Sequence, residues 1–110
     1  MIAADVQFKG AHCSFFEEDF ESTTSNTNIS LSGWKNIAEV GGVSWRGNHF
    51  GGTRFAQASA FNSAGNPPVV TSWLITPGIN LIGTPSANLS FQTIDGFNNG
   101  ATLTVLASTN

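Results

Sequence analysis

Apolar and small polar positions alternate along several short stretches of this chain, most clearly in its second half. In residues 69–76, 88–95 and 101–108, aliphatic or aromatic side chains are interleaved with Ser, Thr, Asn and Gln. Such alternation predicts β-strands, because successive side chains of a strand point to opposite faces. Proline residues at 77 and 85 mark the turns between the first two of these stretches. The pattern predicts three strands in this half.

The first half of the chain repeats the pattern in shorter pieces. Residues 34–37, 43–46 and 53–61 alternate in the same way, and glycine pairs at 41–42 and 51–52 separate them. Strands and turns that recur every 8–12 residues or so are typical of a β-sandwich or barrel. No stretch keeps a helical period beyond a single turn. The sequence therefore predicts an all-β fold, a jelly-roll-like β-sandwich.

The chain of 110 residues is long enough for one domain of about the size of a β-sandwich. Residues 1–14 show no clear period and are expected to be a leader or the tail of a preceding module, so that the domain covers residues 15–110. Residues 22–32, rich in Ser, Thr and Asn, are expected to form a long surface loop. Residues 97–100 end in Asn-Gly, which favours a tight hairpin turn before the last strand.

Composition excludes several classes of function. With 4 basic residues and a net charge of -3, the chain cannot form the basic stripe that nucleic-acid binding requires. No apolar run approaches the roughly 20 residues of a membrane span. The single cysteine, Cys13, cannot form an internal disulfide. It lies beside His12, but the only other histidine is the distant His49, which argues against a zinc site.

The acidic residues are concentrated in one short segment. Glu17, Glu18, Asp19 and Glu21 supply four of the seven carboxylates of the chain, and like charges this close require solvent or a cation between them. Calcium, which takes six to eight oxygen ligands, would neutralise them, and Asp95 could add a second segment of ligands. The alternative is a solvated edge strand whose charges discourage pairing with other molecules.

Two of the three tryptophans have contrasting sequence surroundings. Trp73 stands among aliphatic residues and is expected in the core, beside Phe91 and Leu103 or Val105. Trp45 lies among glycines and polar residues, so it either caps the sandwich or forms a ligand platform with Asn48 and His49. A binding module should expose Trp45 or another aromatic ring beside these two residues, whereas a purely structural spacer should bury every tryptophan.

Enzymatic motifs are missing from the sequence. There is no Gly-x-Ser-x-Gly nucleophile elbow and no phosphate-binding loop, and neither histidine has a partner that the sequence reveals. Neighbouring acids on one strand do not straddle a substrate as glycoside hydrolysis requires. The chain is therefore expected not to be an enzyme.

Several segments together resemble the choice-of-anchor J family and the related cleaved adhesin domain of secreted bacterial surface proteins. The resemblance runs from Phe15 to Asn110, about the N-terminal two-thirds of the family domain. The segments that carry it are FEEDFE at 16–21, WKNI at 34–37, AQASAFNS at 56–63, SWLITP at 72–77 and LSF at 89–91 with Asp95 and Gly96.

This resemblance implies a galactose-binding or MAM-like jelly roll in an exported protein, secreted or at the cell surface. It implies a non-catalytic binding or adhesion module, with carbohydrate or a surface protein as partner, and it favours Glu18 and Asp95 as calcium ligands with Glu21 as a further one. A purely structural spacer or assembly domain is the alternative. Because the family's last strands would be missing, the chain is also expected to self-associate through strand pairing near residues 101–108.

Overall fold

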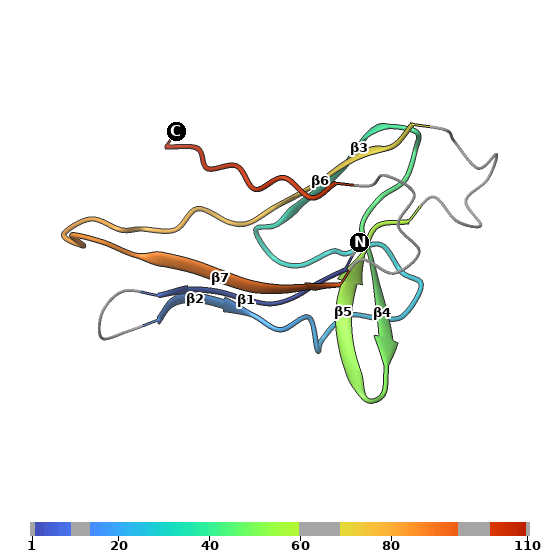
Figure 1. Cartoon of the computed structure of the whole chain (residues 1–110), viewed down its shortest axis with the longest axis horizontal. Coiled ribbons are helices and arrows are strands. Elements are labelled where there is room, and N and C mark those ends of the chain that lie inside the picture. The colour runs from blue at the N-terminus through green and yellow to red at the C-terminus, as the bar shows by residue number, and fades with distance from the viewer. Residues whose placement is uncertain (1, 10–13, 60–68, 95–101, 110) are drawn as a thin grey trace.

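The protein is all-β, and its strands form two antiparallel sheets (Figure 1). A computed structural model describes residues 2–9, 14–59, 69–94 and 102–109. Within these ranges the secondary structure consists of strands, turns and extended segments, with no helix. The strands are β1 (Ile2–Lys9), β2 (Ser14–Glu18), β3 (Lys35–Val40), β4 (Arg46–Phe50), β5 (Thr53–Gln57), β6 (Thr71–Ile75) and β7 (Asn88–Ile94).

The larger sheet is organised around β1. One edge of β1 pairs along its length with β7, from Ile2 opposite Ile94 to Lys9 opposite Asn88. The other edge pairs first with β5 and then with β2, so β1 is the central strand. The expectation that residues 1–14 precede the domain is therefore wrong for Ile2–Lys9. The sequence of this strand hides its role because its alternation is weak and Ala3, Ala4 and Asp5 interrupt it.

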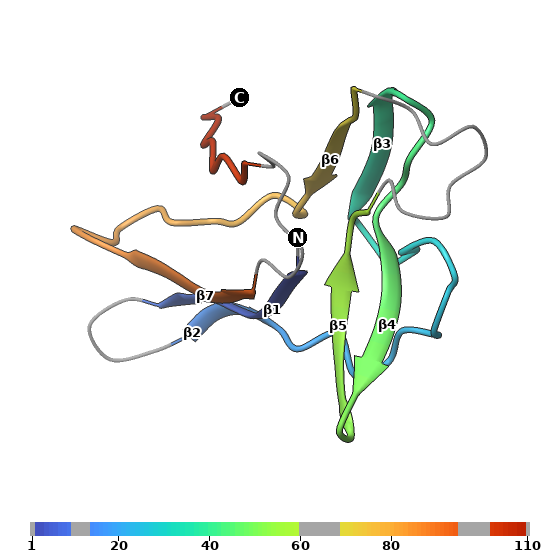
Figure 2. The ribbon, with the colours of Figure 1, turned by 45° about the vertical axis from the view of Figure 1, so that its right-hand side comes forward.

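The remaining strands form a hairpin and a small second sheet (Figure 2). β4 and β5 form a two-stranded hairpin that continues the larger sheet through the contact of β5 with the start of β1. β3 pairs with β6 in a separate two-stranded sheet, with Ile37 opposite Trp73. In Figure 2 the hairpin and the β3–β6 sheet lie together on one side, and β1, β2 and β7 lie on the other.

The core lies where the two sheets meet. Its buried side chains are Phe20, Ile29, Trp45 and Ala56, and the partly buried residues packed around them include Val6 of β1 and Leu74 of β6. Phe16 and Phe20 also contact the ring of Trp34, with centroids 5.7 Å apart in both pairs. Residues 22–32 form the expected loop, but Ile29 turns inward from it. The β3–β6 sheet is thereby joined to the larger sheet through apolar packing.

Strand positions in the second half agree with the sequence pattern in two of three places. β6 and β7 fall within residues 69–76 and 88–95 as predicted. The predicted strand at 101–108 is wrong, because residues 102–109 are extended without ladder pairing. The predicted turn at 97–100 lies outside the described residues. Leu103 nevertheless packs against the core, whereas Val105 and Leu106 are exposed.

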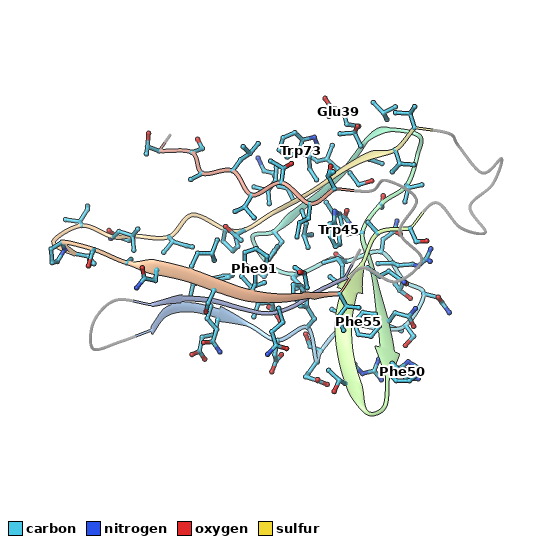
Figure 3. The ribbon with its side chains drawn as sticks, viewed as in Figure 1. Glu39, Trp45, Phe50, Phe55, Trp73 and Phe91 are labelled. Atoms are coloured by element: carbon cyan, nitrogen blue, oxygen red, sulfur yellow. The ribbon has the colours of Figure 1, made fainter. Side chains whose placement is uncertain are left out.

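Trp73 is not a core residue, contrary to the expectation from its aliphatic neighbours. It is 38% exposed on the outer face of the β3–β6 sheet, and its indole Nε1 donates a hydrogen bond of 2.8 Å to Glu39 (Figure 3). The inward position belongs to its neighbour Leu74. The alternation predicted for β6 is correct, but the predicted inward face is wrong: Leu74 faces the core and Trp73 faces outward.

Trp45 is buried and Trp73 is partly exposed, so their replacement should affect stability differently. Trp45→Ala removes a buried ring and should lower the free energy of unfolding by about 3–5 kcal/mol. Trp73→Ala removes a half-exposed ring and one hydrogen bond and should cost about 1–2 kcal/mol. Urea denaturation of both variants would check this ranking, and an equal or reversed cost would contradict the location of the core.

Residues 102–109 form no strand, so β7, rather than the segment near residues 101–108, is the strand through which we expect the chain to self-associate. Its only strand partner among the described residues is β1, its seven residues contain no charge, proline or glycine, and all of them except Phe91 are exposed. An uncharged edge strand of this kind accepts another strand. We expect association that increases with concentration in light scattering, and Gln92→Lys should reduce it. Ser30→Lys on an exposed loop is the charge-matched control. A monomer of 11.6 kDa at all concentrations would contradict the expectation.

Candidate ligand-binding face

The outer face of the β4–β5 hairpin carries the best candidate site. Strand alternation and the pairing of Asn48 with Phe55 place one set of side chains on this face. On the opposite face, Gly47 and Ala56 are buried against the rest of the molecule, whereas His49, nearer the turn, is exposed. We call the outward set the hairpin face; it consists of Arg46, Asn48, Phe50, Thr53, Phe55 and Gln57.

The turn makes this hairpin stiff. Gly51 and Gly52 have φ angles of 60° and 84°, the left-handed values that a two-residue type I′ turn requires at both positions. This turn matches the twist of the flanking strands, so pairing continues up to Phe50 opposite Thr53. Phe50 is 83% exposed at the end of the hairpin (Figure 3). Its ring is thus held in solvent by a backbone that is fixed on both sides.

The loop of residues 22–28 supports the hairpin from the inner side. Asn26 N donates to Gly47 O over 2.8 Å, and Gly47 N donates to Thr27 O over 2.9 Å. Arg54 Nη1 donates to Thr23 O over 3.0 Å. A Cβ atom at Gly47 would lie 2.6 Å from Thr24 O, so only glycine lets the loop approach this closely. The loop therefore fixes the position of β4 relative to the core.

The two amide side chains of the hairpin face are fixed as a pair. Asn48 Nδ2 donates to Gln57 Oε1 over 3.0 Å, and Asn48 Oδ1 accepts a hydrogen bond of 2.9 Å from His49 N. Arg46 lies directly opposite Gln57 in the ladder. The Arg46 Nε atom is buried and has no hydrogen-bond partner among the described residues. The face thus combines aromatic rings, ordered amides and an unpaired guanidinium donor.

Of the predicted ligand-binding residues, Trp45 is placed differently from the expectation of an open platform. It is 5% exposed, and its Nε1 donates to the backbone carbonyl of Ser72 over 3.3 Å. The prediction of an open ring at this position is wrong. The glycine-rich surroundings suggested exposure, but side chains alternate here: Trp45 and Gly47 face inward, whereas Arg46 and Asn48 face outward.

Asn48 and His49 lie on opposite faces of β4, so the structure does not bring them together. Asn48 belongs to the hairpin face, and the His49 ring Nδ1 hydrogen-bonds the Ser25 hydroxyl on the inner side. The exposed aromatic ring beside them is Phe50 rather than Trp45. Phe55 was also missed as a site residue. The buried Ala56 sets the facing of β5 and places Phe55 outward, which the sequence alone left undecided.

Side chains alternate along the acidic segment, with Glu17 and Asp19 exposed and Phe20 buried. Glu18 Oε2 accepts a hydrogen bond of 2.8 Å from Phe20 N, where the backbone leaves β2 with a positive φ of 61°. Glu21 Oε1 accepts one of 3.2 Å from Arg54 N. These two predicted calcium ligands therefore serve different backbone amides.

An open pocket of about 240 Å³ lies beside the acidic segment, lined by Gln7, Glu17, Glu18 and Asp19. Within the described ranges, no group of three or more His, Cys, Asp or Glu side chains is arranged to hold a metal ion. Asp95, the third predicted ligand, lies outside the described residues, as do His12 and Cys13. The described side chains alone do not fit a calcium site, so calcium binding stays a prediction from the sequence.

Comparison with known proteins gives no relative: no family model, curated protein or solved structure matches this chain. In the described part of the chain, no helix has the length and apolar character needed to cross a membrane.

The support of the hairpin by the loop can be tested at Gly47. Gly47→Ala places a methyl group against Thr24 O and Thr23, and overpacking of this kind costs about 1–3 kcal/mol. We expect a lower thermal midpoint for this variant. Gly78→Ala, where an added Cβ meets no atom within 4 Å, is the matched control and should unfold close to the parent. Equal midpoints for the two variants would contradict the close approach of the loop.

Proposed function

We propose that this chain is a non-catalytic binding module whose hairpin face binds carbohydrate. The observation that carries the proposal is the ring of Phe50, which is 83% exposed on a stiff hairpin and shares its face with Phe55 and an ordered amide pair. Sugar rings present apolar C–H faces that stack on aromatic rings and hydroxyl groups that exchange hydrogen bonds with amides. The hairpin face offers both kinds of contact on one surface.

The expected affinity follows from the size of this surface. Complete burial of an exposed Phe side chain contributes roughly 1.5–3 kcal/mol, and part of this is offset by the loss of freedom on binding. A dissociation constant of 1 mM corresponds to about 4.1 kcal/mol. Two rings and a few hydrogen bonds therefore provide only weak affinity at a single site. Adhesion would then depend on several sites acting together.

A binding role without catalysis agrees with the chemistry around the site. Stacking and amide hydrogen bonds require no activated nucleophile. The Ser25–His49 pair is the one place in the described structure where a hydroxyl meets a histidine ring, and no carboxylate of a described residue completes a triad with it. We therefore assign this pair to the support of the loop against β4.

The same proposal includes the architecture and location of the domain. The resemblance to choice-of-anchor J and cleaved adhesin domains favours a jelly-roll-like sandwich in a secreted or surface-exposed protein. The core residues that join the β3–β6 sheet to the larger sheet support a two-layered arrangement. The low charged fraction of 10% is compatible with strands joined by polar turns. Calcium is left out of the proposal because the described acids do not assemble a site.

Phe50→Ala tests the proposal directly. The side chain lies outside the core, so the variant should unfold within about 0.5 kcal/mol of the parent. Binding to immobilised polysaccharides, measured by affinity electrophoresis or on a glycan array, should decrease at least tenfold. Trp73→Ala removes the exposed tryptophan of the other sheet and is the matched control, expected to keep binding.

The two variants also separate the alternatives. If Trp73→Ala abolishes binding and Phe50→Ala does not, the carbohydrate site belongs to the β3–β6 face. If the parent protein retains no glycan under multivalent display, the binding proposal is wrong and the structural spacer becomes the better reading.

A further inference from the structure

The hairpin is the basic part of an acidic molecule. β4 and β5 contain Arg46, Arg54 and His49 and no acidic residue, whereas the whole chain has 7 acidic and 4 basic residues. Half of the basic residues are therefore placed on ten residues of strand. A local surplus of positive charge in a protein of net charge -3 favours an anionic ligand at this position.

The two arginines do not have the same role. Arg54 faces the inner side, where its guanidinium donates to Thr23 O and its backbone amide to Glu21. Arg46 belongs to the hairpin face, and its Nε atom has no hydrogen-bond partner among the described residues. Its Nε is buried all the same. A buried donor without a partner is uncommon in folded proteins. Arg46 as a whole is only half-buried, so an acceptor from elsewhere would meet the remaining N–H groups of its guanidinium rather than Nε.

The neighbouring amides cannot easily provide that acceptor. Gln57 Oε1 accepts from Asn48, and Asn48 Oδ1 accepts from His49 N. The carbonyl oxygens of the pair are thus already engaged. The Gln57 Nε2 group and the Arg46 guanidinium remain, and both are donors. A planar group with two acceptor oxygens, such as a carboxylate, matches the fork of the guanidinium.

We propose that the hairpin face binds an acidic sugar, with the carboxylate of a uronic acid residue held by Arg46. Arg46 pairs with Gln57, so Phe55 is its diagonal neighbour across the ladder, at a Cα separation of about 7–8 Å. A sugar ring stacked on Phe55 can direct its carboxylate to Arg46, and the next ring of the polysaccharide reaches Phe50 at the turn. This inference rests on the proposed carbohydrate-binding function and names its ligand class.

The test uses trigalacturonic acid, its methyl ester and poly-glutamate as probes, with binding followed by NMR titration of the whole chain. The acid and the ester share rings and hydroxyls and differ in the charged carboxylates. We expect the acid to bind at least tenfold more tightly than the ester, with an affinity that falls as salt is added. Poly-glutamate, which has carboxylates but no sugar rings, should bind at least tenfold more weakly than the acid.

Arg46→Gln should remove the preference for the acid, so that the acid and the ester bind with equal affinity. Lys35→Gln on β3, a strand of the other sheet, is the charge-matched control and should change neither affinity by more than twofold. The comparison of acid with ester on the parent protein decides the question even if Arg46→Gln does not fold.

Each contrary result has a distinct meaning. Equal affinity for acid and ester overturns the assignment of Arg46 and leaves carbohydrate binding intact. Poly-glutamate bound as tightly as the acid overturns it as well, because carboxylates alone would then suffice. If trigalacturonic acid, its ester and neutral glycans all fail to bind, the proposed function itself is wrong.

Discussion

The contact between Trp45 and Asn36 is the constraint on which most of the structure depends. Asn36 Oδ1 accepts from Trp45 N over 2.9 Å, and Asn36 Nδ2 donates to Trp45 O over 2.6 Å. The same Nδ2 group donates to Ile29 O. Trp45 lies just before β4. The side chain of Asn36 therefore forms with its backbone the two hydrogen bonds that a neighbouring strand would otherwise provide. It satisfies the amide of Trp45 and the carbonyl of Ile29, and it adds a second donor to Trp45 O, which also accepts from Ile29 N over 2.9 Å. Leaving such backbone groups buried without partners is costly.

This contact determines which side chains of the hairpin face outward. Trp45 is fixed in the core, between Asn36 of β3 and the carbonyl of Ser72 on β6. Since side chains alternate along β4, Gly47 must then also face inward, and Arg46 and Asn48 must face solvent. A shift of one residue would invert both faces of the strand. The composition of the hairpin face is thus a consequence of core packing several residues away.

The class of fold and the later strands could be predicted because they depend on local information. β6 and β7 show a clear period of two, and the alternation of Phe16, Glu18 and Phe20 is visible before any packing is known. The choice of face could not be predicted, because Trp45 and Trp73 both have neighbours that fit either environment. It depends on the cross-sheet contacts of Trp45 with Asn36 and Ser72, which no window of the sequence contains.

The candidate site shows the same division between local and non-local information. Asn48 could be proposed as a site residue from its polar, glycine-rich surroundings. Phe55 and Arg46 could not, because the facing of their side chains depends on the burial of Ala56 and Trp45.

The charges of the exposed strands favour the hairpin over β2 and β7 as the site that binds an anionic ligand. β2 carries Glu17 and Glu18 and repels anionic chains, and β7 is uncharged and suited to pairing with another strand. Among the described strands, the hairpin carries both arginines and no acidic residue, and it exposes the ring of Phe50. Its type I′ turn keeps Phe50 in place before any ligand arrives, so little conformational freedom is lost on binding. Preorganisation therefore offsets part of the affinity that the small contact area cannot provide.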